Sequence, residues 1–113
     1  MKLFFIFFDI LFFEVIILHY NIIVLSNKIQ TCEHFHVISS KIKLIDDCNL
    51  LLNNENISFD YLIITDLSLV EGYKEIGILT ENKIPVTNYE HQTSIENIYY
   101  TQESRVFNII NEL

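Results

Sequence analysis

The sequence is poor in the residues that break or reverse a chain, with two glycines and one proline in 113 residues. Tight turns must therefore use asparagine or aspartate, which tolerate a left-handed backbone. Two glycines cannot supply a GxGxxG fingerprint, so the classical dinucleotide-binding loop is excluded. The two cysteines, Cys32 and Cys48, form neither a CxxC pair nor a disulfide framework, which is compatible with a reducing cytoplasm.

Positive charge is also scarce, since 7 Lys and Arg stand against 15 Asp and Glu and give a net charge of −8. An acidic surface without a basic cluster repels phosphate backbones, so nucleic acid is disfavoured as a partner. The chain is instead rich in apolar residues, which make up 50% of it. This composition excludes a disordered chain and predicts one small folded unit with a hydrophobic core.

The apolar stretch from Leu3 to Leu25 has two interpretations. A single helix of this length could span a bilayer. Asp9 and Glu14 interrupt the stretch, and each acid near a membrane centre costs about 2.5–3.5 kcal/mol. The interpretation that we favour is a strand end followed by a buried helix of a cytoplasmic protein; a membrane-associated protein is the alternative.

The helix is expected because apolar residues recur at spacings of three and four, as on one face of a helix. The residues of this face are Ile10, Phe13, Ile17 and Tyr20. Asp9 would cap the start of the helix, and Asn21 would end it.

The rest of the chain alternates short apolar segments with polar turns. Strands are expected over residues 22–26, 28–32, 37–38, 41–45, 49–52, 57–65, 84–86 and 95–100. Segments 37–38 and 41–45 would pair with each other, 46–47 and 53–56 would be turns, and 84–86 would lie at a sheet edge because of Pro85. The run Tyr61 to Ile64 is typical of a strand covered on both faces.

Between these strands, residues 66–83 are expected to be mixed loop with one helical turn over 70–76. Val106, Ile109, Ile110 and Leu113 predict a partial C-terminal helix over 104–113. The fold class is therefore α/β or α+β, with an N-terminal helix, a mostly antiparallel set of short strands and this C-terminal helix.

Four segments carry a resemblance to a known family. They are FDI at 8–10 continuing to IIV at 22–24, ISFDYLIIT at 57–65, EIGI at 75–78 with KIPV at 83–86, and QTSIENIY at 92–99. Together they resemble the FAD-dependent pyridine nucleotide–disulfide oxidoreductases, in particular the soluble pyridine nucleotide transhydrogenase and dihydrolipoamide dehydrogenase types. The last segment is the most specific, because it is similar to the family's "qTsvpnIYA.GD", which leads into an FAD-contacting segment.

The resemblance implies that residues 1–65 are a partial NAD(P)-binding domain and residues 66–113 a partial FAD-binding domain. It implies FAD and NAD(P) as cofactors, but both dinucleotide fingerprints, the redox cysteine pair and the dimerisation domain of the family are missing. The family's Gly-Asp falls on Gln102 and Glu103, where the acid would contact the flavin's ribityl chain. The family's Gly-Arg falls on Asp66 and Leu67, without the arginine.

The changed positions are ligand-facing in the family, whereas the matching segments pack its core. Gln102 adds a side chain where the family's glycine leaves the backbone bare. Glu103 keeps the charge on a longer side chain; its alternative role is an exposed carboxylate at a helix start, favoured by the helix dipole.

One further pattern could bind metal. Cys32, His34 and His36 alternate, so on a strand they would share one face, and zinc favours sulfur and imidazole ligands. The fourth ligand would be His91 or Cys48, and an ordinary strand surface is the favoured alternative. Asp46, Asp47 and Asp60 are interpreted as turn and strand-edge acids, and serine and histidine occur at no spacing that predicts a nucleophile and its base.

Three functional hypotheses follow. The first is a fragment of an FAD-dependent NAD(P) oxidoreductase of the transhydrogenase type, without activity unless a second polypeptide supplies the missing domains. The second is a small membrane-anchored protein that uses Leu3 to Leu25 as its anchor. The third is a non-catalytic interaction module with sticky exposed faces.

Overall fold

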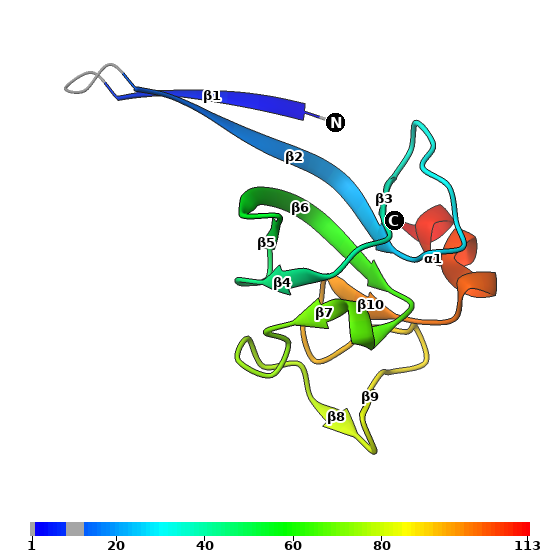
Figure 1. Cartoon of the computed structure of the whole chain (residues 1–113). Coiled ribbons are helices and arrows are strands. Elements are labelled where there is room, and N and C mark those ends of the chain that lie inside the picture. The colour runs from blue at the N-terminus through cyan, green and yellow to red at the C-terminus, as the bar shows by residue number, and fades with distance from the viewer. Residues whose placement is uncertain (1, 9–12) are drawn as a thin grey trace.

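A computed structural model describes the backbone of residues 2–8 and 13–113, and the side chains from residue 18 onward. The described elements form an eight-stranded mixed sheet, a two-stranded sheet and one C-terminal α-helix (Figure 1). The strands are β1 (Lys2–Phe8), β2 (Phe13–Leu25), β3 (His36–Ile38), β4 (Ile42–Leu44), β5 (Asn49–Leu52), β6 (Glu55–Ile64), β7 (Val70–Glu71), β8 (Thr80–Glu81), β9 (Ile84–Pro85) and β10 (Ile98–Tyr100). The helices are η1 (Leu67–Leu69), η2 (Glu103–Arg105) and α1 (Val106–Glu112).

Strand β6 is the centre of the large sheet. It pairs in parallel with β2, with Leu18 opposite Ile57 and Leu25 opposite Ile64. Its first half also pairs antiparallel with β5, and its last three residues pair in parallel with β10. Because β3 adds to β2 in the same direction, β3, β2, β6 and β10 run parallel and side by side.

Both faces of this parallel part are covered. On one face, Leu62 and Ile64 pack with residues of β4, β5, β7 and Ile78. On the other face, Ile63 packs with Val106 and Ile109 of α1. Leu62, Ile63 and Ile64 are each 0% exposed, which confirms the expectation that this run is covered on both sides.

The side-chain alternation breaks at the same level in β2 and β6. Strand residues normally alternate between faces, yet Phe59 and Leu62, three residues apart, belong to the same core cluster. Tyr20 and Ile23 of β2 repeat this spacing. The residue Asp60 lies at the break and is not paired with β2.

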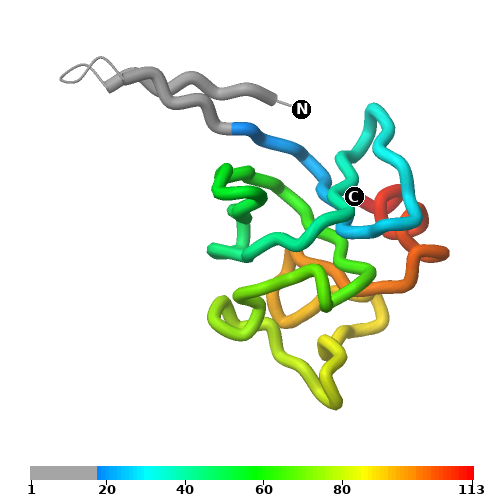
Figure 2. Tube along the Cα trace, viewed as in Figure 1, coloured from blue at the N-terminus to red at the C-terminus, as the bar shows by residue number. Residues whose placement is uncertain are grey.

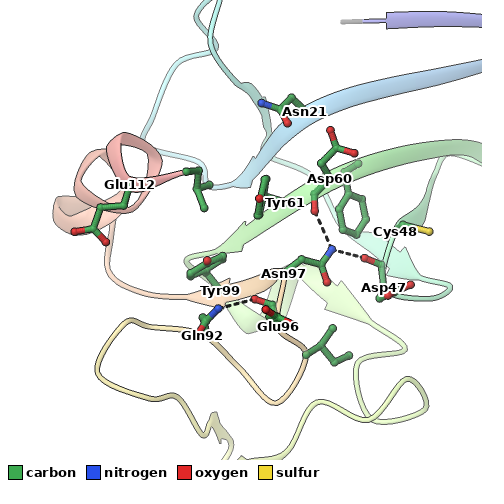
Figure 3. Close-up of a pocket in the computed structure, with 13 residues that line it drawn as sticks. Asn21, Asp47, Cys48, Asp60, Tyr61, Gln92, Glu96, Asn97, Tyr99 and Glu112 are labelled. Carbon is green, nitrogen blue, oxygen red and sulfur yellow. Dashed lines mark hydrogen bonds between the residues drawn. The ribbon is translucent and has the colours of Figure 1, made fainter.

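Asn97 satisfies the backbone groups that this break leaves open. Its Nδ2 donates to the carbonyl oxygens of Asp60 at 2.9 Å and Asp47 at 2.6 Å (Figure 3). Its own carbonyl accepts from the amide of Leu62 at 3.1 Å. One asparagine side chain therefore ties β6 to the turn before β5 and to the segment that leads into β10.

The predicted N-terminal helix is wrong, because Phe13, Ile17 and Tyr20 lie in strand β2; Asp9 and Ile10 lie outside the described residues. A uniformly apolar stretch fills every spacing, so a helical period within it carries little information. The β-branched residues that crowd the stretch favour extended backbone, and β6 supplies a pairing partner. Within residues 2–8 and 13–113, no helix is long and apolar enough to cross a membrane.

The expectation of a mostly antiparallel sheet also needs correction, because four of the eight described strand pairings are parallel. Segments 37–38 and 41–45 do not pair with each other: β3 joins β2, whereas β4 joins β5 and β7. The helical turn expected at 70–76 begins later, with Ile76 donating to the carbonyl of Gly72 at 3.3 Å. The coarser prediction of mixed α and β structure with a C-terminal helix is confirmed.

The expectation that asparagine would replace glycine in tight turns is confirmed. Asn53 and Asn54, at φ 52° and 67°, make the two-residue turn between β5 and β6. Asn82 and Lys83, at φ 52° and 65°, make the same kind of turn between β8 and β9, a hairpin that Figure 2 traces at the tip of the molecule. Two consecutive left-handed residues are typical of a type I′ hairpin turn.

The Asn97 contacts give a first prediction. Asn97→Ala leaves the carbonyls of Asp60 and Asp47 without this donor, so the free energy of unfolding should fall by about 1–3 kcal/mol. Asn108→Ala, on the exposed side of α1, is the matched control and should change it by less than about 0.5 kcal/mol. Urea denaturation measures both variants, and equal stabilities would contradict this role of Asn97.

The β8–β9 turn gives a second prediction. Lys83 holds a left-handed backbone that glycine adopts without steric cost, so Lys83→Gly should raise the free energy of unfolding by about 0.5–1 kcal/mol. Lys74→Gly, at an exposed position without positive φ, should lower it by a similar amount. Thermal or urea unfolding of the pair tests this, and a loss of stability in both variants would refute it.

Candidate functional site

A cleft of about 400 Å³ lies at the carboxyl ends of β6 and β10. β6 and β10 end together, because the amide of Thr101 donates to the carbonyl of Ile64 at 3.0 Å. β2 ends at the same level, because the amide of Thr65 donates to the carbonyl of Leu25 at 3.1 Å. In open sheets with parallel strands, ligands bind at this end. The cleft is lined by Thr65, Ile84, Pro85, Thr87, His91, Tyr100, Thr101, Gln102, Glu103 and Arg105.

Each wall of the cleft has a different origin. Ile84 and Pro85 come from the β8–β9 hairpin, so a segment outside the large sheet closes one side. His91 comes from the loop before β10 and has φ 68°; its carbonyl accepts from the amide of Tyr100 at 3.0 Å. The segment after β10 supplies the remaining side through η2.

The structure places both residues of the predicted flavin contact in this cleft. Gln102 has φ −79° and ψ 153°, an extended conformation that any residue adopts, and its side chain is exposed. Glu103 is the first residue of η2 and is partly exposed. Their contact with a cofactor stays a prediction.

The second position that departs from the family pattern is occupied by a local cap. The Asp66 carboxylate accepts hydrogen bonds from the amide of Ser68 at 3.0 Å and from its hydroxyl at 2.6 Å. These bonds lower the pKa of Asp66. The carboxylate thus starts η1 and is already partnered within the chain.

The strand over 95–100 is shorter than predicted and begins at Ile98. The Thr93 hydroxyl donates to the carbonyl of Ile98 at 2.8 Å, and the amide of Ile98 donates to the carbonyl of Ile95 at 2.9 Å. This tight turn delays the strand, but Gln92 still bridges Tyr99, so the segment 92–99 leads along the sheet toward Glu103.

The possible zinc ligands are not brought together. The strand predicted over 28–32 is absent from the described structure, and Cys32 sits at the start of a turn bridged to Phe35. His34 lies 3.8 Å from Glu33, both exposed, whereas His36 stacks on Tyr20 with ring centroids 4.1 Å apart. Burial lowers the pKa of His36, so this imidazole is a packing group.

Within the described side chains, one group of three potential ligand atoms lies within 4.8 Å of one another, and it consists of Asp46, Asp47 and Cys48. The amide of Cys48 donates to Asp46 Oδ1 at 2.9 Å, which lowers the pKa of Asp46. Partial desolvation within the turn and the Asp46 carboxylate raise the pKa of the Cys48 thiol, which belongs to an exposed residue, to about 11. The Asp46 carboxylate also accepts from the side-chain amide of Asn49 at 3.0 and 3.1 Å, so this turn is a local hydrogen-bonded cap.

Sequence spacing missed a hydrogen-bonded chain of Ser58, His19 and Asp60. The Nδ1 of His19 contacts the Ser58 hydroxyl, and its Nε2 lies 3.2 Å from Asp60 Oδ1. In a serine nucleophile site the carboxylate is buried behind the histidine. Here the Asp60 carboxylate is 49% exposed and the His19 side chain only 15% exposed, so the arrangement differs from such a site. These residues are 39 and 41 positions apart in sequence and meet only through the pairing of β2 with β6.

Asp60 also borders a hollow of about 940 Å³, which Figure 3 shows beside β6 and β10. Its wall carries the carboxylates of Asp47, Asp60, Glu96 and Glu112 and no lysine or arginine. This hollow repels anions, in contrast to the cleft at the carboxyl ends of the strands, which holds one arginine and one carboxylate.

Comparison with known proteins gives no relative. No family model matches the chain, and no curated protein and no solved structure matches it.

The Cys48 thiol gives a third prediction. With a pKa of about 11, its alkylation rate in a Cys32→Ser background should rise about tenfold per pH unit from pH 7 to 10. The additional change Asp46→Asn removes a neighbouring negative charge and a hydrogen bond, so it should increase the rate at pH 8. A rate that levels off near pH 9 in the Cys32→Ser protein would contradict this environment for Cys48.

Proposed function

We propose that this chain is a non-catalytic component of an FAD-dependent NAD(P) oxidoreductase of the soluble transhydrogenase type. The observation that supports the proposal most is the parallel pairing of β6 with β10, two segments that carry the family resemblance. Both strands end at one cleft, and Gln102 and Glu103 follow β10 directly into its wall. This is where the resemblance would put a flavin contact.

Turnover by the chain alone is not part of the proposal. Hydride transfer needs both nucleotides held against each other, and the sequence contains no glycine-rich loop to hold either pyrophosphate. The cleft of about 400 Å³ is also near the lower end of the roughly 300–1,000 Å³ found for ligand sites, which suits part of a dinucleotide. A second polypeptide would supply the rest.

An exposed apolar surface favours a second candidate function, that of an interaction module. The β8–β9 hairpin and the residues on either side of it expose Leu79, Ile84, Val86 and Tyr89 at 63%, 53%, 46% and 93%. Clusters of exposed apolar side chains mark contact sites more often than isolated ones do. Since Ile84 also lines the cleft, a bound partner would lie beside it.

A reconstitution experiment gives a fourth prediction. The tagged chain is co-expressed with polypeptides that carry the two missing dinucleotide-binding loops, and the purified complex is examined for visible flavin absorbance. A complex that contains flavin supports the proposal, whereas the chain purified alone should be colourless.

A pair of matched variants tests whether Glu103 contacts the flavin in this complex. Glu103→Ala should lower the flavin content of the complex, and Glu96→Ala, a carboxylate on the wall of the acidic hollow and outside the cleft, should leave it unchanged. A stable but colourless complex would refute the oxidoreductase proposal and favour the interaction module. No complex at all would count against both.

A further inference from the structure

The charge balance of the cleft points to a ligand class. Arg105 is the only arginine in the sequence, and acids outnumber bases by 15 to 7. In such a chain a guanidinium is expected to have a carboxylate partner. Yet the exposed guanidinium of Arg105 makes no hydrogen bond or ion pair with another described residue. It lines the cleft and also a second hollow, whose wall includes Glu90 and Glu112.

A second polar group in the cleft also lacks a protein partner. Thr101 is 5% exposed, and its hydroxyl makes no hydrogen bond to another described residue, although it borders the cleft. The neighbouring Thr65 differs, because its hydroxyl donates to the carbonyl of Leu25 at 2.7 Å. Among the described residues no fully buried side-chain nitrogen or oxygen lacks a partner, so the Thr101 hydroxyl reaches solvent. Thr101 and the exposed Arg105 therefore each present a free donor at the border of the cleft.

The remaining lining residues fit different parts of one molecule. Ile84, Pro85 and Tyr100 give an apolar wall that suits a planar base. Glu103 is an acceptor for paired hydroxyl groups, as acidic residues are for ribose in nucleotide sites. A guanidinium binds phosphate through two parallel hydrogen bonds, which a lone lysine cannot do.

We propose that this cleft binds a nucleoside monophosphate, with Arg105 and Thr101 on the phosphate, Glu103 on the ribose hydroxyls and the apolar wall on the base. One arginine can neutralise one phosphate, and a longer phosphate chain would meet no further lysine or arginine in the cleft. The ligand class rests on the proposed function, since it concerns the same cleft, but its test needs only the isolated chain.

The test is a titration of the isotope-labelled chain with AMP, followed by amide chemical shifts. AMP should bind saturably and shift the amides of residues 91 and 101–105, whereas inorganic phosphate and adenosine should each bind at least about tenfold more weakly. Shifts confined to the acidic hollow around Asp60 and Glu96, or no saturable shift, would overturn the proposal.

Variants assign the roles. Arg105→Gln should weaken AMP binding by about tenfold or more, and Arg105→Lys should recover part of that loss. Lys74→Gln is the control, because it removes the same charge from an exposed position outside the cleft. Glu103→Gln should reduce the preference for AMP over its 2′,3′-dideoxy analogue. Equal binding by the Arg105→Gln protein and the wild type would refute the role of Arg105.

The AMP titration and the flavin reconstitution test the two proposals independently. If AMP does not bind but the reconstituted complex contains flavin, the inference fails and the proposed function stands. If AMP binds through Arg105 and the complex is colourless, the inference stands and the oxidoreductase proposal fails.

Discussion

Strand β6 depends on being hydrogen-bonded along both edges while it is buried on both faces. Leu62, Ile63 and Ile64 have no exposed surface, so every amide and carbonyl there needs a partner within the protein. Strands β2 and β10 provide those partners, both in parallel orientation. That requirement brings the carboxyl ends of the strands to one edge and thereby fixes the position of the cleft.

The need to pair every buried backbone group also explains the role of Asn97, at the point where the side chains of β6 stop alternating between the two faces of the sheet. The side chains change faces around Asp60, and the carbonyl of Asp60 is taken up by the Asn97 amide instead of the β2 ladder. Beyond this point the sheet opens into the acidic hollow. The two hollows along β6 therefore differ in charge: four carboxylates line the one beside Asp60, whereas one arginine and one carboxylate line the cleft at the carboxyl end. An anion is therefore repelled less at the cleft than at the acidic hollow.

Much of the fold could be predicted where local signals decide the structure. Strand β5 matches its predicted bounds, β4 and β6 match theirs within one or two residues, and the Asn53–Asn54 turn follows from residues that tolerate left-handed backbone. Strand β2 could not be separated from a helix, because its apolar stretch has no distinguishing period. The parallel pairing could have been suspected, since continuous apolar runs are typical of strands covered on both faces.

The candidate site was less accessible to sequence reasoning. Gln102 and Glu103 could be chosen only through the family resemblance, whereas Arg105 carries no motif. Its significance depends on which residues surround it, and the cleft combines the β8–β9 hairpin, the loop at His91 and η2. Likewise Asn97 looked like the weak point of a strand, and its contacts with Asp47 and Asp60 span 50 and 37 residues of sequence.

The distribution of matched and changed positions has a physical explanation under the proposed function. The matching segments contribute Phe59, Leu62 and Ile98 to the core, all 0–1% exposed, where shortening a side chain costs about 2–5 kcal/mol. Gln102 is exposed, and surface changes of that kind usually alter stability by less than about 0.5 kcal/mol. Selection for folding alone would thus preserve the residues of the strands and allow the ligand-facing positions to change. Selection for a ligand bound in the cleft would be needed to preserve those positions as well.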